Sequence, residues 1–228
     1  MIGIIGAMKE EVDALKSKMK DIEERQIAKT VFYEGNLHDK KVVLMQSGIG
    51  KVNAAISTTL LCNHYPISCI INIGTAGGLT QDAEVLDLVI STEVVYYDVD
   101  ATGFNYHYGQ VPQMPPSYHS DEKLIAKLKP VLTALDFSYH EGLIVSGDSF
   151  IDREDQRSFI LGHFPEAIAV DMESTAIAQV AFVFNKPFII LRALSDIAGK
   201  SSSMSFDQFV IHASERSADL VSLFVKKL

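Results

Sequence analysis

Acidic residues follow three apolar runs in this sequence, at the points where predicted strands end. Glu11, Glu173 and Asp196 occupy these positions. A carboxyl group donates a proton when protonated and accepts one when ionised, so these residues suit general acid and general base catalysis. Each of them taken singly has a structural alternative, since acidic residues also cap helices or complement the helix dipole. Their coincidence at several strand ends favours a catalytic site.

Arg192 interrupts the apolar run at 188–195. A guanidinium group is costly to bury unless it is paired or hydrogen-bonded. Because side chains alternate along a strand, Arg192 is predicted to share a face with Asp196. We interpret Arg192 as part of the same site, and a buried ion pair without a chemical role is the alternative.

Glycine-rich segments at 48–50 and 74–78 are predicted to be turns that let the backbone approach a ligand closely. Neither segment completes a nucleotide-binding motif. Asn53 stands where GxGxxG requires its third glycine, and Leu194 stands where a P-loop ending at 199–201 requires its first. The seven His residues show no HExxH or paired metal-ligand spacing. The sequence therefore predicts neither a metal site nor a cofactor.

The elements that must position these residues alternate between apolar β-branched runs and segments with apolar residues at helical spacing. Strands are predicted at 2–6, 31–37, 41–46, 69–73, 85–95, 142–146, 167–170 and 187–194. Helices are predicted at 8–20, 52–63, 121–134, 153–161, 172–184 and 206–227. This order indicates an α/β fold with a twisted, mainly parallel sheet between helices, in which ligands bind beyond the carboxyl ends of the strands.

Length and composition limit the possible classes of protein. The chain has 228 residues, 47% of them hydrophobic, which suits one globular domain spanning residues 1–228. A net charge of -9 without a basic stripe argues against nucleic acid as a partner. No apolar run approaches the ~20 residues of a membrane span, and residues 1–6 lack the features of a secretory signal. The sequence therefore predicts no membrane partner. With only two cysteines, it also predicts a cytoplasmic location.

Residues 96–119 fit neither the strand nor the helix pattern. This segment contains five Tyr, one Phe and three Pro, and few charged residues. Ordered loops of this length are often lids, binding loops or interface segments. The alternative is a surface meander with some buried aromatic side chains.

Six segments spread along the chain carry a resemblance to a known family. They are GIIGAMKEE at 3–11, SGIGKVNAA at 47–55, GTAGG at 74–78, GLIVSGDSFI at 142–151, AVDMES at 169–174 and LRALSD at 191–196. In this order they closely resemble the 5'-methylthioadenosine/S-adenosylhomocysteine nucleosidases of the purine nucleoside phosphorylase superfamily. The resemblance implies a three-layer α/β/α sandwich with a partly barrel-like mixed sheet. It also implies hydrolysis of the N-glycosidic bond of methylthioadenosine and S-adenosylhomocysteine, and also of 5'-deoxyadenosine, in methionine salvage and methyl-cycle recycling.

The resemblance implies a role for each matching position. Asp196 resembles the general acid that protonates adenine, with Ser195 helping to hold it. Glu11 resembles the base that deprotonates the attacking water, and Arg192 and Thr75 would help to position that water.

The remaining positions resemble those that bind the nucleoside. Glu173 and Met172 would hold the ribose hydroxyls, while Phe150 stacks on adenine and the backbone of Ile151 reads its edge. The other implied contacts are Ala76 and Gly77 along the nucleoside, Ile49 and Phe206 at its apolar end, and Phe104, Tyr106 and Pro112 from a neighbouring subunit. The implied assembly is a homodimer whose 96–119 loop reaches the neighbouring site.

Two positions depart from the family pattern, since Thr75 stands in place of Ser and Asp171 in place of Glu. Both substitutions keep the chemical group. One rival interpretation is a phosphorylase that uses phosphate instead of water, but the Glu11 carboxylate would repel phosphate and the six segments contain only three cationic side chains. Another rival is a nucleoside-sensing module without catalysis, which would need neither an acid nor a base.

Overall fold

The computed structural model describes residues 1–80, 82–197 and 206–228, apart from the side chains of residues 196–197 and 206–208. The strands are β1 (Ile2–Gly6), β2 (Lys20–Ile27), β3 (Thr30–Leu37), β4 (Lys40–Gln46), β5 (Cys69–Gly78), β6 (Leu88–Tyr96), β7 (Tyr118–His119), β8 (Tyr139–Ser146), β9 (Ala167–Asp171) and β10 (Phe188–Ile197). The helices are α1 (Lys9–Lys16), α2 (Lys51–His64), α3 (Glu122–Ala134), α4 (Glu154–His163), α5 (Ser174–Val183) and α6 (Phe206–Lys227), with a short 3-10 helix, η1 (Thr102–Phe104).

The ten strands form one mixed sheet in the order β10-β6-β8-β9-β5-β1-β4-β3-β2, with β7 paired to β6. Parallel pairings join β4, β1, β5 and β10 in one set and β6, β8 and β9 in another. Antiparallel pairings of β5 with β9 and of β10 with β6 connect the two sets. The strands β5, β9, β8, β6 and β10 therefore form a closed ring, the barrel-like part of the sheet that the family resemblance implies.

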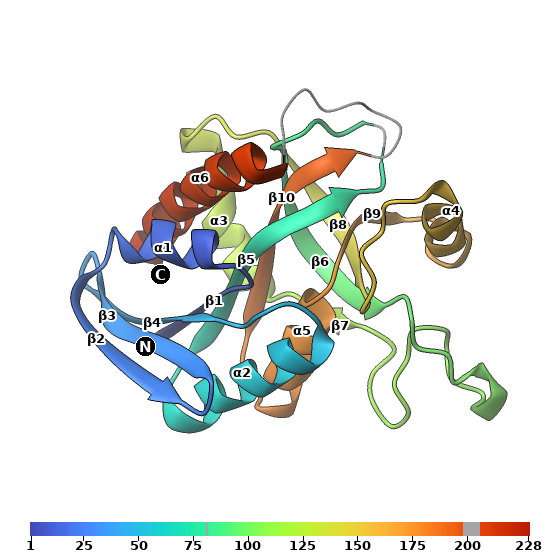
Figure 1. The fold of residues 1–228 in the computed structure, drawn as a ribbon, viewed down its shortest axis with the longest axis horizontal. Helices are drawn as coiled ribbons and strands as arrows, with labels where there is room; N and C mark the ends of the chain where they lie inside the picture. The colour runs from blue at the N-terminus through green and yellow to red at the C-terminus, as the bar shows by residue number, and fades with distance from the viewer. Residues whose placement is uncertain (81, 198–205) are drawn as a thin grey trace.

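Helices cover both faces of this sheet (Figure 1). One core cluster packs apolar residues of α1, α3 and α6 against the strands, and the other packs α2 and α5 against the opposite face. A smaller cluster beneath α4 includes Val145, Ile160 and Phe164. The predicted α/β sandwich is confirmed.

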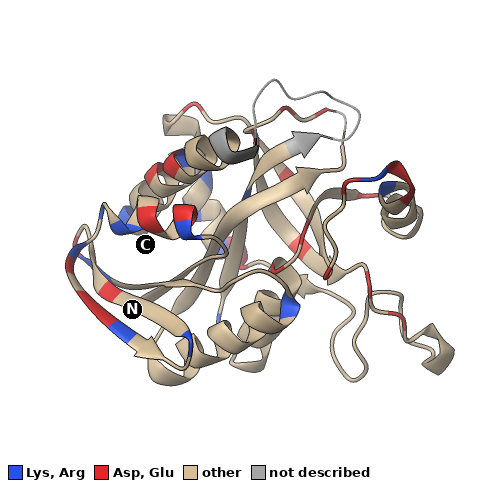
Figure 2. Cartoon of the chain, viewed as in Figure 1, with Lys and Arg blue, Asp and Glu red and all other residues tan. Residues whose placement is uncertain are grey.

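Charged residues gather on the outer elements, whereas the central strands carry few of them (Figure 2). The edge strand β2 is exposed over most of its length and has the sequence KDIEERQI. Charged side chains on an exposed edge discourage pairing with a further strand. No helix among the described residues has both the length and the apolar character that crossing a membrane requires.

Several predicted boundaries were wrong for physical reasons. The helix predicted at 8–20 ends at Lys16, and Lys20 begins β2, which the sequence did not indicate because this strand has no apolar face. The segment at 74–78, predicted to be a turn, is instead the end of β5. Its residues pair with β10 from Gly74 to Gly78, so tertiary pairing extends the strand through the glycines.

The aromatic segment at 96–119 leaves the sheet at Tyr96 and returns through β7, which pairs with β6. Between these points the chain projects away from the body of the molecule (Figure 1). Its aromatic residues differ in burial, since Tyr97 and Tyr118 are buried and Phe104 is 80% exposed.

Candidate active site

A pocket that is open to solvent lies beyond the carboxyl ends of β1, β5 and β9. Small-molecule ligands commonly bind in concave sites of this kind. The last residues of β5 and β9 pair with each other, which brings the two strand ends together. The lining residues are Ala7, Met8, Glu11, Ile49, Gly74, Thr75, Ala76, Gly77, Ser149, Phe150, Ile151, Val170, Asp171, Met172, Glu173 and Ser195.

Most of the predicted site residues meet in this pocket. Those that line it are Glu11, Ile49, Thr75, Ala76, Gly77, Phe150, Ile151, Met172, Glu173 and Ser195. The predicted residues outside its lining are Arg192, Phe104, Tyr106 and Pro112. The side chains of Asp196 and Phe206 lie outside the described residues.

Glu11 occupies the third position of α1, and its side chain folds back over the start of the helix. The backbone N–H groups of Ala7 and Met8 donate to its Oε2 atom at 2.7 and 3.0 Å. Glu11 is only 2% exposed, and its Oε1 atom has no hydrogen-bond partner among the described residues. Burial raises the pKa of Glu11, opposed by the hydrogen bond from Met8 and the charge of Arg192. One oxygen thus caps the helix, while the other remains able to accept a hydrogen bond from a ligand.

Glu173 lies at the start of α5, directly after β9, and is also buried. The backbone N–H of Gly50 donates to its Oε1 atom at 2.9 Å. Gly50 has a φ of 93°, a conformation that favours glycine, at the N-terminus of α2. Burial, together with the nearby charge of Asp171, raises the pKa of Glu173 to about 7.

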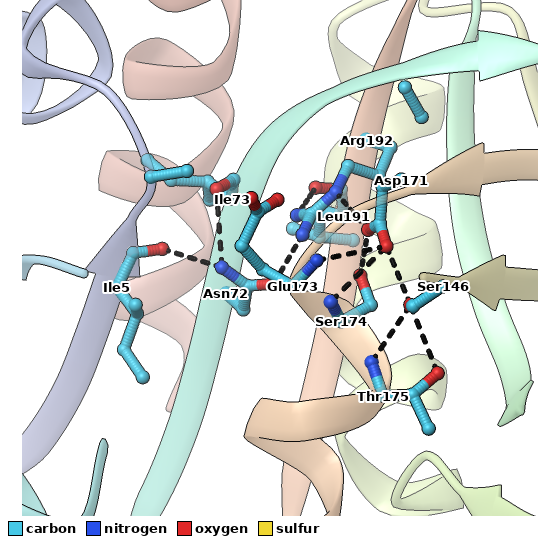
Figure 3. A network of polar contacts seen from close by, with 12 residues as sticks. Ile5, Asn72, Ile73, Ser146, Asp171, Glu173, Ser174, Thr175, Leu191 and Arg192 are labelled. Atoms are coloured by element: carbon cyan, nitrogen blue, oxygen red, sulfur yellow. Dashed lines mark hydrogen bonds and ion pairs between the residues drawn. The ribbon is translucent and has the colours of Figure 1, made fainter. Parts of the chain in front are cut away.

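Arg192 lies behind the pocket lining in a buried polar network (Figure 3). Its Nε donates to Oδ2 of Asp171 at 2.8 Å, and a second guanidinium nitrogen donates to Oδ1 of Asn72 at 2.6 Å. Asn72 in turn donates to the carbonyl oxygen of Ile5 at 2.9 Å. A Cβ atom at Gly74 would lie only 3.1 Å from the guanidinium, so the glycine makes room for Arg192. The network connects β1, β5, β9 and β10 beneath the pocket.

Asp171 is the centre of this network on the β9 side. Besides Arg192, it accepts hydrogen bonds from the hydroxyls of Ser146 and Ser174 and from the backbone N–H of Ser174. Sequence reasoning considered Asp171 only as a departure from the family pattern. It also missed Asn72, although an amide in the middle of an apolar strand is the same kind of signal as Arg192.

The prediction that Arg192 shares a face with Asp196 rested on regular alternation along the strand, and that basis was wrong. The pairing of β10 with β5 shifts between Leu194 and Asp196, which interrupts the two-residue period. The backbone of Asp196 pairs with Gly77, and the hydroxyl of Ser195 donates to the carbonyl oxygen of Ala76 at 3.2 Å. Among the side chains that the structure describes, Asp171 is the ion-pair partner of Arg192.

The mouth of the pocket is apolar. Phe150, which is 66% exposed, follows β8 together with Ile151, and Ile49 precedes α2. In contrast, the side chains of Phe104, Tyr106 and Pro112 belong to the projecting segment and do not line the pocket of their own chain.

The arrangement suits acid–base chemistry on an apolar ligand. Glu11 and Glu173 are buried carboxyl groups with raised pKa values in one pocket, with a guanidinium behind them. Such groups transfer protons near neutral pH, and their carboxylates stabilise developing positive charge. Among the described residues, no group of three or more His, Cys, Asp or Glu side chains is placed to hold a metal ion.

Residues 1–226 match the phosphorylase superfamily. The sequence is 51% identical over 227 residues to a 5'-methylthioadenosine/S-adenosylhomocysteine nucleosidase of Oceanobacillus iheyensis, covering 100% of this chain and 99% of the relative. The chain belongs to this nucleosidase family. A nucleosidase of Staphylococcus haemolyticus is 50% identical, with full coverage of both chains.

Solved structures of the nucleosidase family have the same fold. The Neisseria meningitidis nucleosidase in complex with methylthio-immucillin-A has a TM-score of 0.95 and 42% identity, covering 100% of this chain and 99% of that one. The Colwellia psychrerythraea nucleosidase in complex with adenine has a TM-score of 0.93 and 38% identity, covering 100% and 95%. The family resemblance found in the sequence is therefore confirmed.

Proposed function

We propose that this chain hydrolyses the N-glycosidic bond of 5'-methylthioadenosine and S-adenosylhomocysteine, releasing adenine and the 5-thio-substituted ribose. The observation that carries the proposal is the buried Oε1 atom of Glu11, which lacks a hydrogen-bond partner among the described residues in a pocket that also contains Glu173. The 51% identity to a nucleosidase of this specificity supports the same substrates.

The two N–H donors on Oε2 fix the Glu11 carboxylate, so that Oε1 is the atom available to a water molecule. An ionised Glu11 accepts a proton from that water molecule while the oxygen of the water attacks the anomeric carbon of the ribose. The bond to adenine breaks, and the bonding electrons leave with the base. We assign the proton donor for adenine to Asp196, whose backbone pairs with Gly77 at the pocket wall.

As the bond breaks, positive charge develops on the ribose, and Glu173 supplies negative charge beside it. The Gly50 N–H occupies one oxygen of this carboxylate, which leaves the other for the ribose hydroxyls. Met172 would contact the sugar, and Phe150 and Ile151 would contact the adenine. Thr75 and Arg192 would help to position the water, Arg192 by charge from behind the lining.

Hydrolysis is favoured over phosphorolysis by the charge of the pocket. Its described lining contains the carboxylates of Glu11, Asp171 and Glu173 and no Lys or Arg side chain. An anionic phosphate nucleophile requires cations or several donors where this pocket places carboxylates.

The test is adenine release from methylthioadenosine by the purified protein, first without phosphate and then with phosphate added back. We expect release without phosphate, with free methylthioribose identified by mass. Release that requires phosphate and yields a sugar 1-phosphate would establish a phosphorylase instead. Tight binding without release would establish a nucleoside sensor.

We further propose that the protein is a homodimer in which Phe104, Tyr106 and Pro112 reach the neighbouring pocket. The 80% exposure of Phe104 on a projecting segment supports this assignment. Apolar side chains are also exposed on α2 and α5, the helices that begin next to the pocket residues Ile49 and Glu173, including Val52, Ile56, Phe182 and Val183. Exposed apolar surface of this kind is typical of interaction sites. Sedimentation analysis should give twice the chain mass, and a monomer at assay concentration would contradict the proposal.

We also propose 5'-deoxyadenosine as a third substrate, because the exposed Ile49 side chain would place apolar surface beside the 5' substituent. The corresponding place in metabolism is methionine salvage in the cytoplasm. Comparison of adenine release from the three nucleosides tests the substrate range.

A further inference from the structure

Three charged residues form a cluster beside the pocket that the proposed chemistry does not use. The Lys51 ammonium group donates to the two oxygens of Asp98 at 2.8 and 2.7 Å and lies 3.9 Å from Oδ2 of Asp148. The backbone N–H of Lys51 donates to Oδ1 of Asp148 at 2.8 Å. The backbone N–H of Asp148 donates to Asp98 at 3.0 Å. Each member of the cluster thus contacts the other two.

The cluster joins three segments that are distant in sequence. Lys51 begins α2, directly after the turn in which Ile49 lines the pocket and Gly50 donates to Glu173. Asp148 precedes the Ser149–Ile151 lining segment that includes Phe150. Asp98 lies where the projecting aromatic segment leaves the sheet.

Additional contacts show how closely these segments fit together. The Tyr97 hydroxyl donates to the carbonyl oxygen of Ser149 at 3.0 Å. A Cβ atom at Gly147 would lie 2.4 Å from the Tyr97 ring and 2.9 Å from the Asp98 carboxyl carbon. A Cβ atom at Gly50 would lie 3.1 Å from Asp148. A small shift of one segment therefore displaces the others.

Charge makes Lys51 the essential member of the cluster. Its side chain is 24% exposed, and those of Asp98 and Asp148 are 27% and 48% exposed. Without the ammonium group, two adjacent carboxylates would repel each other at partly buried positions. Asp148 would then move away from Asp98, carrying the Phe150 segment and the start of α2 with it.

We propose that Lys51 is a positioning residue for substrate binding. It fixes the distance between the Phe150 segment and the turn that holds Glu173, and it does so without lining the pocket itself. This inference rests on the proposed function, because Phe150 and Glu173 are assigned there to the adenine and the ribose.

The test compares Lys51→Met with wild type in adenine release from methylthioadenosine and in calorimetric binding of adenine. Lys51→Met removes the charge-assisted pairing with Asp98, so we expect KM and the adenine Kd to rise about tenfold. We expect any fall in kcat to be smaller than the rise in KM, because Glu11 and Asp196 are outside the cluster and only Glu173 is held through it. Lys51→Arg keeps the charge and should restore both constants to near the wild-type values.

The matched control is Lys129→Met, which removes an ion pair of similar length, 2.9 Å to Glu141, from residues that do not line the pocket. It should leave KM unchanged. Asp98→Asn is a second variant of the cluster and should also raise KM, in case Lys51→Met does not fold.

Unchanged KM and adenine Kd in both cluster variants would overturn the inference, as would a fall in kcat alone or an equal effect of the control. Absence of adenine release by the wild type would instead overturn the proposed function. Because calorimetry needs no turnover, weaker adenine binding by Lys51→Met would still support the positioning role in that case.

Discussion

The two oxygens of Glu11 have different surroundings, and this difference gives the residue two functions. Oε2 accepts two backbone hydrogen bonds and so caps α1, whereas Oε1 is buried and unpartnered within the described structure. Both interpretations of an acidic residue after a strand therefore apply to one side chain. The helix cap orients the carboxylate that would act as the base.

Glu11→Gln separates these two functions. The amide oxygen of the glutamine can still accept hydrogen bonds from the N–H groups of Ala7 and Met8. The NH2 group then takes the place of Oε1, and it donates hydrogen bonds instead of accepting them. We expect the variant to fold and bind adenine but to lose at least about 100-fold in kcat, the scale of general base catalysis. Steady-state kinetics together with thermal unfolding would check this, and turnover near the wild-type rate would remove Glu11 from the mechanism.

Asp196→Asn tests the assigned proton donor. The amide cannot protonate adenine, so we expect kcat to fall by about 100- to 10,000-fold while adenine binding persists. A substrate analogue whose leaving group needs no protonation should be cleaved by the variant at a rate closer to wild type. Equal loss on both substrates would contradict the role of general acid.

The pKa of Glu173, raised to about 7, predicts a dependence of stability on pH. A carboxyl group whose pKa is higher in the folded than in the unfolded state stabilises the fold most at low pH. This contribution is lost as the pH rises from about 4.5 towards 7, and it is constant above that. Urea unfolding at pH 5 and 7.5 should therefore show Glu173→Gln gaining stability relative to wild type at the higher pH. A pH-independent difference would contradict the raised pKa.

The same shift determines how activity depends on pH. If ionised Glu173 stabilises the positive charge on ribose, kcat/KM should rise with pH through about 7. If kcat/KM instead fell at high pH without first rising through about pH 7, this assignment would be wrong.

At the scale of elements, the sequence predicted the strands that carry apolar residues on at least one face. Runs such as Cys69–Ile73 and Phe188–Ile190 are apolar on both faces because helices cover both sides of the sheet, and they were assigned correctly. β2 was missed because it has charged residues on both faces at the sheet edge. The turn predicted at 74–78 failed because glycine was interpreted as a turn former, whereas Gly74 leaves space for Arg192.

The sequence predicted those site residues whose side chains can transfer protons and which directly follow a predicted strand, as Glu11 and Glu173 do. The partners of Arg192 were not predictable in this way. Asp171 reaches it from β9, and Asn72 from β5, through pairings that depend on the closure of the sheet. The irregular pairing near Ser195 also has no signature in the local sequence.

A substitution at Phe104 tests whether the projecting aromatic segment contributes to substrate binding. Phe104 does not line the pocket of its own chain, so any effect on substrate binding must come through a second chain. We expect Phe104→Ala to raise KM for methylthioadenosine more than for adenosine, because the apolar contact is with the 5' thioether. Ile22→Ala on the edge strand β2, which removes another exposed apolar side chain, is the control and should affect neither substrate. Equal effects of Phe104→Ala on both substrates would exclude the segment from the thioether subsite.

At the scale of the whole molecule, the closed ring of β5, β9, β8, β6 and β10 determines where the chemistry lies. Antiparallel pairing of β5 with β9 joins the two parallel sets at their carboxyl ends, so residues of both sets face one pocket. The net charge of -9 is carried largely by outer elements, and the carboxylates inside the pocket are instead buried. The pocket therefore differs from the surface in that its acids are buried and the pKa values of Glu11 and Glu173 are raised.

The buried network around Arg192 restricts which substitutions can occur at its positions during evolution. Replacing Arg192, Asp171 or Asn72 alone would leave an unpaired charge or amide in the interior, which is strongly destabilising. A protein with one such substitution would be too unstable to persist in evolution unless a second substitution compensated for the lost partner. Substitutions that remove the charge or the amide at these three positions should therefore occur together or not at all among relatives, whereas an exchange that keeps the carboxyl group, such as Glu for Asp at position 171, is tolerated. The exposed positions of β2 should vary independently of one another.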